Sequence, residues 1–530
     1  MQILLHQINF SKRILIMLSL IITCGFIQAQ EPQKPNVVFV LLDDLGFSQT
    51  GYMSQGITEA DLDPLFVEYT AERYKTKNSY TPQQAIEFAR RATPTIDKMA
   101  SEGVIFSNAY AASNLCAPSR IAIATGTMPN KLGIYTNTDC EARGPNKGAL
   151  LVQNLKDSGY ATAHIGKWHV GRQDPNYRKQ YRGSTHKNDH PYQHGFDYYY
   201  GYNMYDSPFY NADNVWEGYK KLEKNPKYNT DLFTDKALEF MQQSIEGDKP
   251  FYVQLHLHAV HAPLNPKAPD NYFKQFNSDS YLLNNFYAHI YGVDQNIKRV
   301  KTFLQQHNID DNTIIIFTSD NGGSVGWDSP LPGNAPYRGH KGMYLLGGIR
   351  VPMFISWPKG IPKAHEEKNL VSTIDIIPTV LSAAGVDIPE DIDGKDLTPY
   401  LSGTSKKPVR NHYVCSGIHS WAWGFMCSHS FHQFNETRKR ATFASVVIKE
   451  GYLWRYVGET VEHLYKEYPD GRPAYYEMYN IKNDPQERDN KIESEKKKAK
   501  QLKSIWKQES STFPPPQHGK KDLWNDIINN

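Results

Sequence analysis

The sequence has few cysteines, little net charge and no long apolar run beyond its N-terminus. Five cysteines among 530 residues exclude a disulfide-dense scaffold, so a large apolar core must stabilise the fold. The net charge of +3, without a block of either sign, gives no nucleic-acid footprint. No internal segment is long and apolar enough for a stable membrane span, and no repeat is present. We expect one large domain plus a smaller one.

The N-terminus has the pattern of an export signal. Lys12 and Arg13 precede a short apolar stretch, and the small residue Ala29 follows it. This order predicts a signal peptide at residues 1–29 and a secreted or periplasmic protein. Acylation of Cys24, as in a lipoprotein, is a weaker second interpretation, because the residue before it fits poorly.

Apolar runs and helical patterns alternate along the next part of the chain. Short β-branched runs starting at Asn36, Phe251 and Asn312 predict buried strands. Patterns typical of helices cover Tyr281–Gln306 and Pro94–Glu102. Strands that alternate with helices predict an α/β fold with a large central, mostly parallel (mixed) sheet sandwiched by helices.

A change of composition near residue 405 predicts a domain boundary. Residues 30–405 would form the main α/β domain. Residues 406–530 would form a smaller C-terminal α+β subdomain, with a small antiparallel sheet and a charged helix around Lys491–Lys507. Two polar, aromatic-rich stretches, about 55–91 and 173–214, are predicted to be loops or insertions.

Polar residues follow three of the predicted strands, and we expect them to share one site. They are Asp43, Asp44, His258, Asp320 and Asn321. In open α/β sheets, ligands gather at the carboxyl ends of strands. Adjacent carboxylates repel each other, so a pair at a strand end needs a cation or solvent. Carboxylate and amide oxygens are hard ligands that suit calcium or magnesium.

The run CAPSR, from Cys116 to Arg120, is the most specific motif in the chain. It resembles the C/S-x-P-x-R signature of type I sulfatases, in the alkaline-phosphatase-like superfamily. The resemblance implies that Cys116 is oxidised to formylglycine (3-oxoalanine) by a maturation enzyme, and that its hydrate is the nucleophile. A structural cysteine before a turn-forming proline is the alternative.

The same resemblance implies a calcium ion and a set of cations for the sulfate group. The implied calcium ligands are Asp43, Asp44, Asp320 and Asn321, with Cys116 completing the set. HIGKWHVG, from His164, is similar to the family's GKWHLG block, and RGHKGMYLLGGIRVP, from Arg338, is similar to RGGKGxxxEGGxRVP. By this resemblance Lys167 and Lys341 bind sulfate, while Arg120 and His169 act on the nucleophile.

Two departures from the family pattern affect histidines. In HAVHAP, valine replaces the first proline of the family's PH-x-P, and His258 adds a second imidazole. The resemblance favours His261 as the general acid and leaves His258 beside the substrate, but which of the two acts stays open. His340 replaces a small residue beside Lys341; it either faces the substrate or packs. Leu346 stands where an acid is common.

Further blocks in the family's order cover most of the chain, including HGFDYYYGYN and YEMYNIKNDPQERDN. They imply a sulfuric ester hydrolase, and export together with aromatic-rich loops suggests a sulfated carbohydrate substrate. A phosphoester or phosphonate hydrolase, or a non-catalytic protein that binds sulfated glycans, are the alternatives. If Cys116 is modified and Cys24 leaves with the signal peptide, three cysteines remain and allow one disulfide. Cys415 and Cys427 are the closest pair in sequence, but the sequence does not fix the pairing.

Overall fold

The computed structural model describes residues 34–74, 79–145, 150–174, 184–204, 207–324, 329–420, 441–460 and 475–515. The predicted signal peptide, with Cys24, lies outside these ranges, as does Cys427, one of the cysteines left open for a disulfide. Cys415 is a free, buried thiol. Among the described residues, no helix has both the length and the apolar character that crossing a membrane requires.

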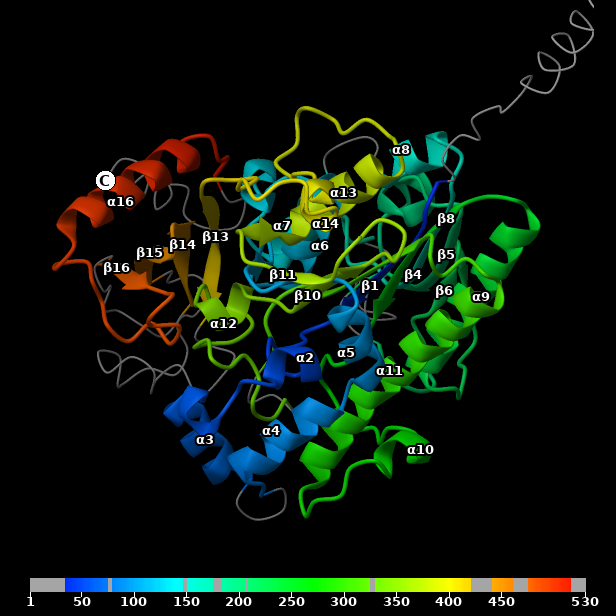
Figure 1. Ribbon diagram of the computed structural model, residues 1–530, viewed down its shortest axis with the longest axis horizontal. Helices are drawn as coiled ribbons and strands as arrows, with labels where there is room; N and C mark the ends of the chain where they lie inside the picture. Colours follow the sequence, from blue (N-terminus) through cyan, green and yellow to red (C-terminus); the bar gives the residue numbers. More distant parts are fainter. Residues whose placement is uncertain are drawn as a thin grey trace, which may run out of the picture.

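A ten-stranded mixed sheet forms the centre of the molecule (Figure 1). Its middle is parallel: β9, β1, β8, β4 and β5 lie in that order, and each pairs with its neighbours in parallel register. The predicted strands are therefore confirmed at the centre of a mostly parallel sheet. These five strands span Thr313–Ser319, Asn36–Leu42, Phe251–Leu257, Ala161–Lys167 and Tyr198–Tyr202.

The edges of this sheet introduce antiparallel pairing. β10 pairs antiparallel with β9 and β2, and β6 pairs antiparallel with β5 and β7. The edge strands are β10 (Met353–Ser356), β2 (Val104–Phe106), β11 (His365–Glu367), β6 (Trp216–Glu217) and β7 (Lys220–Lys221). A separate pair joins β12 (Val371–Ser372) to β3 (Ala109–Tyr110).

Helices cover both faces of the sheet (Figure 1). Alternate residues of β1 point to opposite sides, so Val38 and Val40 pack in one apolar core while Val37 and Phe39 pack in another. The first core takes in α4 (Pro82–Arg91), α5 (Pro94–Ser101), α9 (Asn229–Glu246) and α11 (Tyr281–Gln306). The second takes in α6 (Cys116–Thr125), α8 (Val152–Asp157) and α13 (Ile376–Ala383).

Shorter helices and 3₁₀ turns join these layers. The helices are α2 (Gly51–Ser54), α3 (Pro64–Tyr74), α7 (Asn137–Arg143), α10 (Asp270–Phe273), α12 (Leu346–Ile349) and α14 (Thr398–Leu401). The 3₁₀ turns are η1 (Glu59–Asp61), η2 (Pro129–Leu132), η4 (Lys187–Asp189), η5 (Pro191–Gln193) and η6 (Thr373–Asp375).

The prediction of a loop over residues 55–91 is wrong, because this stretch contains α3 and α4. Thr81 caps α4: its side chain accepts from the backbone N–H of Gln84, and the Gln84 side chain accepts from that of Thr81. This reciprocal cap, with proline at the first helical position, outweighs the polar composition. In the stretch 173–214, the described part contains η4, η5 and β5.

The C-terminal part contains a four-stranded antiparallel sheet in the order β13-β14-β15-β16, at the left of Figure 1. Its strands span Tyr413–Ser420, Ala441–Lys449, Tyr452–Thr460 and Tyr475–Asn480. The helix α16 (Lys496–Ser510) packs on this sheet through Trp506, whose ring lies 5.3 Å from that of Trp454. The predicted small sheet and helix are present, although the helix starts five residues later than expected.

Candidate functional site

The carboxyl ends of β1, β8 and β9 meet, because β1 lies between the other two. The backbone N–H of Asp44 donates to Asp320 Oδ1 at 3.2 Å, and Asn321 Nδ2 donates to Asp44 Oδ1 at 2.8 Å. Asp43 and His258 lie at the same edge, with 3.7 Å between Asp43 Oδ2 and His258 Nδ1. The structure thus brings together the five polar residues that the sequence places at strand ends.

Cys116 enters this cluster at the start of α6. Its Sγ and carboxylate oxygens of Asp43 and Asp320 lie within 4.8 Å of one another. Asn137, which begins α7, accepts from the backbone N–H of Ala117 at 3.2 Å, and its Nδ2 lies 3.8 Å from Cys116 Sγ. Asn137 therefore holds both the side chain of residue 116 and the first turn of α6, a role that the sequence did not reveal.

Arg120 is one turn further along α6 and crosses the site. Its Nε and Nη2 lie 3.0 Å and 2.9 Å from Asp320 Oδ2, and Nη2 lies 3.6 Å from Asp43 Oδ1. Its Nη1 donates to the carbonyl of Lys167 at 3.1 Å. These contacts fix a fully buried guanidinium whose pKa is raised, since Asp320 and Asp43 outweigh the effect of burial.

Two buried lysines complete the ring of cations. Lys167 Nζ donates to Asp43 Oδ2 at 2.7 Å, and Lys341 Nζ donates to Asp44 Oδ2 at 2.8 Å. Lys167 ends β4. Lys341 lies on a loop, and its own backbone N–H donates to the carbonyl of Gly323. Segments from four distant parts of the sequence therefore meet within one cluster.

The three carboxylates respond differently to this environment. Burial alone would raise the pKa of Asp43, but Lys167 and nearby histidines hold that pKa well below its ordinary value. Burial also opposes ionisation of Asp44, and Lys341 lowers the pKa of that carboxyl. For Asp320, burial outweighs Arg120 and raises the pKa to about 6. Of the three carboxyls, Asp320 is therefore the one whose ionised form would be favoured most by further positive charge at the site.

Two oxygen atoms of the cluster fit a metal ligand's role. Among the described residues, nothing donates a hydrogen bond to Asp43 Oδ1 or Asn321 Oδ1, although both are buried. Buried polar atoms are nearly always satisfied, so such exceptions point to a partner of another kind. These two oxygens, one from a carboxylate and one from an amide, are the kind of ligand that a hard divalent cation prefers.

The histidines lie beside these carboxylates. His258 Nδ1 lies 2.9 Å from Tyr202 Oη, and this ring is fully buried. His261 Nε2 lies 3.7 Å from Asp44 Oδ2, and 20% of its side chain is exposed. Burial, with Lys341, lowers the pKa of His261 to about 4. His261 is thus the imidazole that solvent can reach.

His169 and His340 complete the predicted set. His169 follows β4, is buried, and has a positive φ of 49°. Non-glycine residues with positive φ cluster at functional sites, and Asp44, with φ 61°, is a second case here. His340 is buried; its Nδ1 lies 2.7 Å from the carbonyl of Lys341 and its ring packs edge-on against Phe66.

Sequence reasoning missed a second group of residues, which holds the Lys341 loop from the C-terminal sheet. The backbone N–H of Leu346 donates to Glu487 Oε1 at 2.7 Å, and Arg455 Nη1 donates to the carbonyl of Tyr344 at 3.0 Å. His419 Nδ1 accepts from the backbone N–H of Tyr344 at 2.9 Å. Arg455 also forms buried ion pairs with Glu487 and Glu477. The sequence offered one signal of this contact: Leu346 stands where an acidic residue is common in the family pattern.

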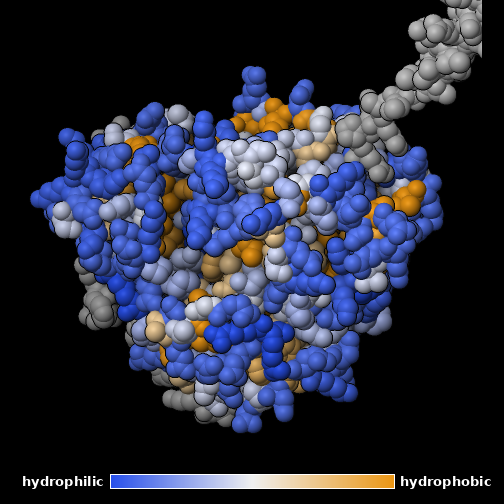
Figure 2. All heavy atoms as spheres, in the orientation of Figure 1, coloured by the Kyte–Doolittle hydropathy of each residue, from blue (hydrophilic) through white to orange (hydrophobic). Residues whose placement is uncertain are grey.

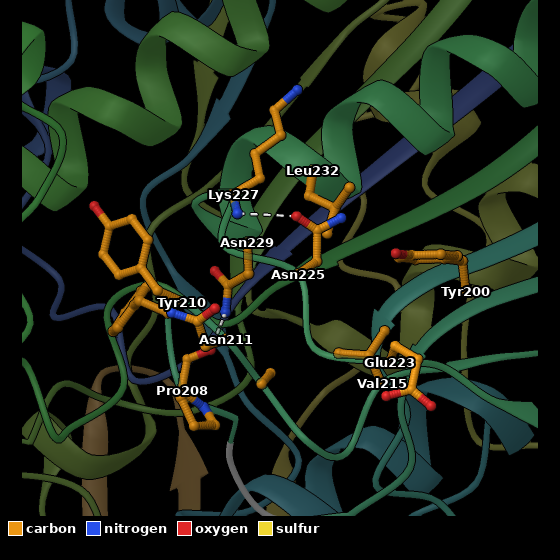
Figure 3. A pocket seen from close by; sticks show the side chains of 12 residues that line it. Tyr200, Pro208, Tyr210, Asn211, Val215, Glu223, Asn225, Lys227, Asn229 and Leu232 are labelled. Atoms are coloured by element: carbon orange, nitrogen blue, oxygen red, sulfur yellow. Dashed lines mark hydrogen bonds between the residues drawn. The ribbon is translucent and has the colours of Figure 1, made fainter.

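A small pocket beside β5 lies outside this cluster (Figure 3). Its internal space is about 10 Å³, enough for a single water molecule. Asn229 Nδ2 donates across it to the carbonyl of Pro208. The aromatic residues near it also belong to the core: Tyr199, Tyr200 and Tyr202 are buried. This pocket is too small for a sugar, so it is no substrate site.

The α/β fold, together with the buried cluster of cations and carboxylates, defines a class of hydrolase that acts on anionic substrates. The family model described as Sulfatase matches residues 35–386. The chain therefore belongs to the sulfatase family and is a sulfuric ester hydrolase.

Relatives and solved structures agree with this family. The chain is 35% identical to the uncharacterised sulfatase YdeN of Escherichia coli over 408 residues, covering 74% of this chain and 70% of that protein. It is 30% identical to N-acetylgalactosamine-6-sulfatase of Mus musculus over 422 residues, with the same two coverages. The structure of Ps i-CgsB with k-i-k-neocarrahexaose superposes with a TM-score of 0.67 at 23% identity, covering 94% of this chain and 98% of that one.

Proposed function

We propose that this sulfatase cleaves sulfate esters of a carbohydrate, with formylglycine at position 116 and a calcium ion. One observation carries the proposal. Cys116, three carboxylates, an arginine and two lysines from separate segments lie in one buried cluster at the carboxyl edge of the sheet. A phosphoester hydrolase would need the same kind of site, so the comparison of the two ester classes belongs in the test.

The charges of the cluster explain why a divalent cation is needed. The ionised carboxylates Asp43, Asp44 and Asp320 balance the cations Arg120, Lys167 and Lys341, so these six side chains together are neutral. A neutral cluster offers little net attraction to an anionic ester. A divalent cation gives the cluster a charge of about +2 and complements both the ester and a developing negative charge.

The chain provides a set of oxygen ligands for that ion. The proposed ligands are Asp43, Asp44, Asp320 and Asn321, together with residue 116. The bound calcium and the formylglycine hydrate would supply positive charge and the hydroxyl nucleophile, respectively. Ligation of Asp320 would favour its ionised form, against the burial that raises its pKa.

The remaining side chains bind and orient the ester. Lys167 and Lys341 are proposed to hold sulfate oxygens, since the ammonium of Lys167 donates to Asp43 and that of Lys341 donates to the adjacent Asp44. Arg120 and His169 are proposed to hold the nucleophile, because Arg120 lies one turn from residue 116. His258 and His340 are proposed to line the substrate side; the hydrogen bond between Tyr202 Oη and Nδ1 fixes the His258 ring.

His261 is proposed as the general acid that protonates the leaving oxygen. Its partial exposure lets it reach a bound ester, whereas His258 is fully buried. Burial lowers the pKa of this ring to about 4, so the ring must gain its proton as the ester binds, when the negative charges of Asp44 and of the ester together favour the imidazolium. A positioned imidazole of this kind typically contributes about 100- to 10,000-fold in rate.

A carbohydrate substrate is supported by relatives. A relative is named N-acetylgalactosamine-6-sulfatase, and a solved structure with the same fold holds D-glucosamine-2-N,6-O-disulfate. We also propose export through the signal peptide at residues 1–29 and maturation of Cys116 by a formylglycine-generating enzyme. The domain limits at residues 30–405 and 406–530 remain part of this proposal.

The test combines chemistry at residue 116 with a comparison of esters. Mass spectrometry of the peptide that contains Cys116 should show formylglycine in protein from a host with the maturation enzyme. Purified protein should hydrolyse para-nitrophenyl sulfate and sulfated oligosaccharides faster than para-nitrophenyl phosphate, and Cys116→Ala should abolish turnover. Unmodified cysteine in an active protein, or faster release of phosphate than of sulfate, would contradict the proposal.

A further inference from the structure

The helix α16 carries a concentrated positive charge. Its 15 residues include six lysines and one glutamate, an excess larger than the net +3 of the whole chain. One face of the helix is apolar and packs on the C-terminal sheet through Leu502 and Trp506. The lysines therefore lie on the remaining surface, and the outer side of α16 is hydrophilic in Figure 2.

Five of these lysines form what we call the basic stripe. Lys496, Lys500, Lys503 and Lys507 follow a spacing of four, three and four residues, which keeps them on one side of the helix. At a rise of ~1.5 Å per residue, they extend over about 16 Å. Lys497 lies next to the first of them. The stripe is Lys496, Lys497, Lys500, Lys503 and Lys507.

At the start of the helix, the lysines of the basic stripe have few acidic partners among the described residues. Lys496 lies 3.6 Å from Glu493, but these side chains are 79% and 84% exposed, so solvent screens the pair. Among the described residues, no carboxylate lies within 4.0 Å of Lys497 or Lys500. An open depression of about 450 Å³, lined by residues 494–498 and Gln501, borders the stripe.

This arrangement costs helix stability. Each pair of like charges four residues apart, such as Lys496 with Lys500, is unfavourable by ~0.2–0.5 kcal/mol. The first turn contains lysines, which the helix dipole disfavours, and the acidic residues at this end, Glu493 and the N-cap Glu495, precede the helix. A helix that only covered a sheet would be stabilised by acidic residues at these positions. A local rule broken without a gain inside the chain points to a partner outside it.

We propose that the basic stripe binds a sulfated polysaccharide and holds it near the enzyme. This proposal rests on the proposed carbohydrate substrate and extends it from a sulfated sugar to a polymer. Successive sulfate groups on an extended polyanion can each meet one ammonium, and lysine's flexible point charge tolerates uneven spacing. Binding at a second surface raises the effective concentration of ester groups at the active site without any new contact there.

The test neutralises the stripe without removing side-chain bulk. Glutamine has nearly the helix propensity of lysine, and Lys503 is left intact because it lies over the ring of Tyr476. The stripe variant combines Lys496→Gln, Lys497→Gln and Lys500→Gln, three exposed lysines at the start of the helix. A control variant makes the same change of charge at three exposed lysines elsewhere, with Lys224→Gln, Lys249→Gln and Lys274→Gln.

Binding is measured with dextran sulfate at low salt, in a Cys116→Ala background that prevents hydrolysis. We expect the stripe variant to lose at least about tenfold in affinity and the control variant to retain the parent's affinity. Added salt should weaken binding by the parent. In proteins with Cys116 intact, both variants should hydrolyse para-nitrophenyl sulfate like the parent.

Three outcomes would overturn the proposal: equal affinity of the two variants, equal binding of unsulfated dextran by the parent, or tighter binding of the parent to anionic lipid vesicles than to dextran sulfate. If the parent binds dextran sulfate but does not hydrolyse para-nitrophenyl sulfate, the proposed function fails and the binding surface stands.

Discussion

Single residues decide the chemistry of this site, and His261 illustrates how. Its ring lies beside Asp44 and is the exposed member of a pair with His258, whose centroid is 5.4 Å away. His258 marks this chain's departure from the family pattern, and the structure ties it to Tyr202 instead of leaving it at the surface. A difference in exposure thus separates two imidazoles that the sequence could not rank from residue chemistry alone.

A leaving-group test separates these roles. We expect His261→Asn to lower kcat by about 100- to 10,000-fold on a sugar sulfate, whose alkoxide must be protonated as it leaves. The loss should be far smaller on para-nitrophenyl sulfate, because that leaving group is stable as an anion. His258→Asn is the matched control and should affect both esters similarly. Equal losses on the two esters for His261→Asn would assign the acid elsewhere.

Removal of the metal tests the oxygen ligands. Treatment with a calcium chelator should abolish turnover, and added calcium should restore it. Calcium should also raise the melting temperature, because an ion that binds the folded state at 100 times its Kd adds about 2.7 kcal/mol of stability. Asp320→Asn should weaken that shift. A melting temperature that ignores calcium in the parent would contradict the ligand set.

At the scale of elements, the C-terminal sheet acts on the active site through one loop. Glu487 and Arg455 contact the backbone of residues 344–346, a few residues after Lys341. Arg455 is buried between two carboxylates, so the contact is rigid and depends on balanced charge. The position of Lys341, the proposed sulfate ligand, therefore depends on Arg455 of β15 and on Glu487 beyond β16, both more than a hundred residues later in the sequence.

Glu487→Gln tests this link. The amide keeps the shape of the side chain but weakens its charged hydrogen bonds to Leu346 and Arg455. We expect KM for para-nitrophenyl sulfate to rise about tenfold, equivalent to ~1.4 kcal/mol, with a smaller change in kcat. Glu477→Gln is the control, because Glu477 also pairs with Arg455, whereas the carboxylate that accepts from the backbone of Leu346 is that of Glu487. Equal KM changes in both variants would reduce Glu487 to a role in stability.

Local patterns predicted the elements that carry the site better than those around it. The strand ends with Asp43 and Asp320 and the helix Tyr281–Gln306 follow directly from hydrophobic periodicity. Residues 55–91 were misjudged because composition hides a capping box at Thr81. The contact between Leu346 and Glu487 joins residues 141 positions apart, and no local pattern encodes such a pairing.

At the scale of the whole molecule, many histidines are buried in the neutral form. Burial lowers the pKa of His289 and His190 to about 4 and that of His164 to about 3, from the ordinary 6.5. Burial also lowers the pKa of His256 and His419 well below that value. Unfolding returns all of these rings to water, where they bind protons more readily.

This burial predicts acid sensitivity. Between pH 6.5 and about 4 the unfolded chain binds more protons than the folded one, so stability is complete above pH 6.5 and falls as pH drops through this window. Each such histidine contributes a slope of up to ~1.4 kcal/mol per pH unit. Burial raises the pKa of Asp97, Asp294 and Asp320 to about 6 and also raises that of Asp375; these carboxyls act in the opposite direction but are fewer than the buried histidines.

Urea unfolding at several pH values measures the slope, and His289→Asn identifies one contributor. His289 is fully buried between Tyr228 and the carbonyl of Pro266. The variant should be less stable at neutral pH, because the ring's contacts are lost, yet its stability should fall less steeply between about pH 6.5 and about pH 4. A slope identical to the parent's would mean that His289 keeps its ordinary pKa in the folded protein. In that case burial would not be the cause of acid sensitivity at this position.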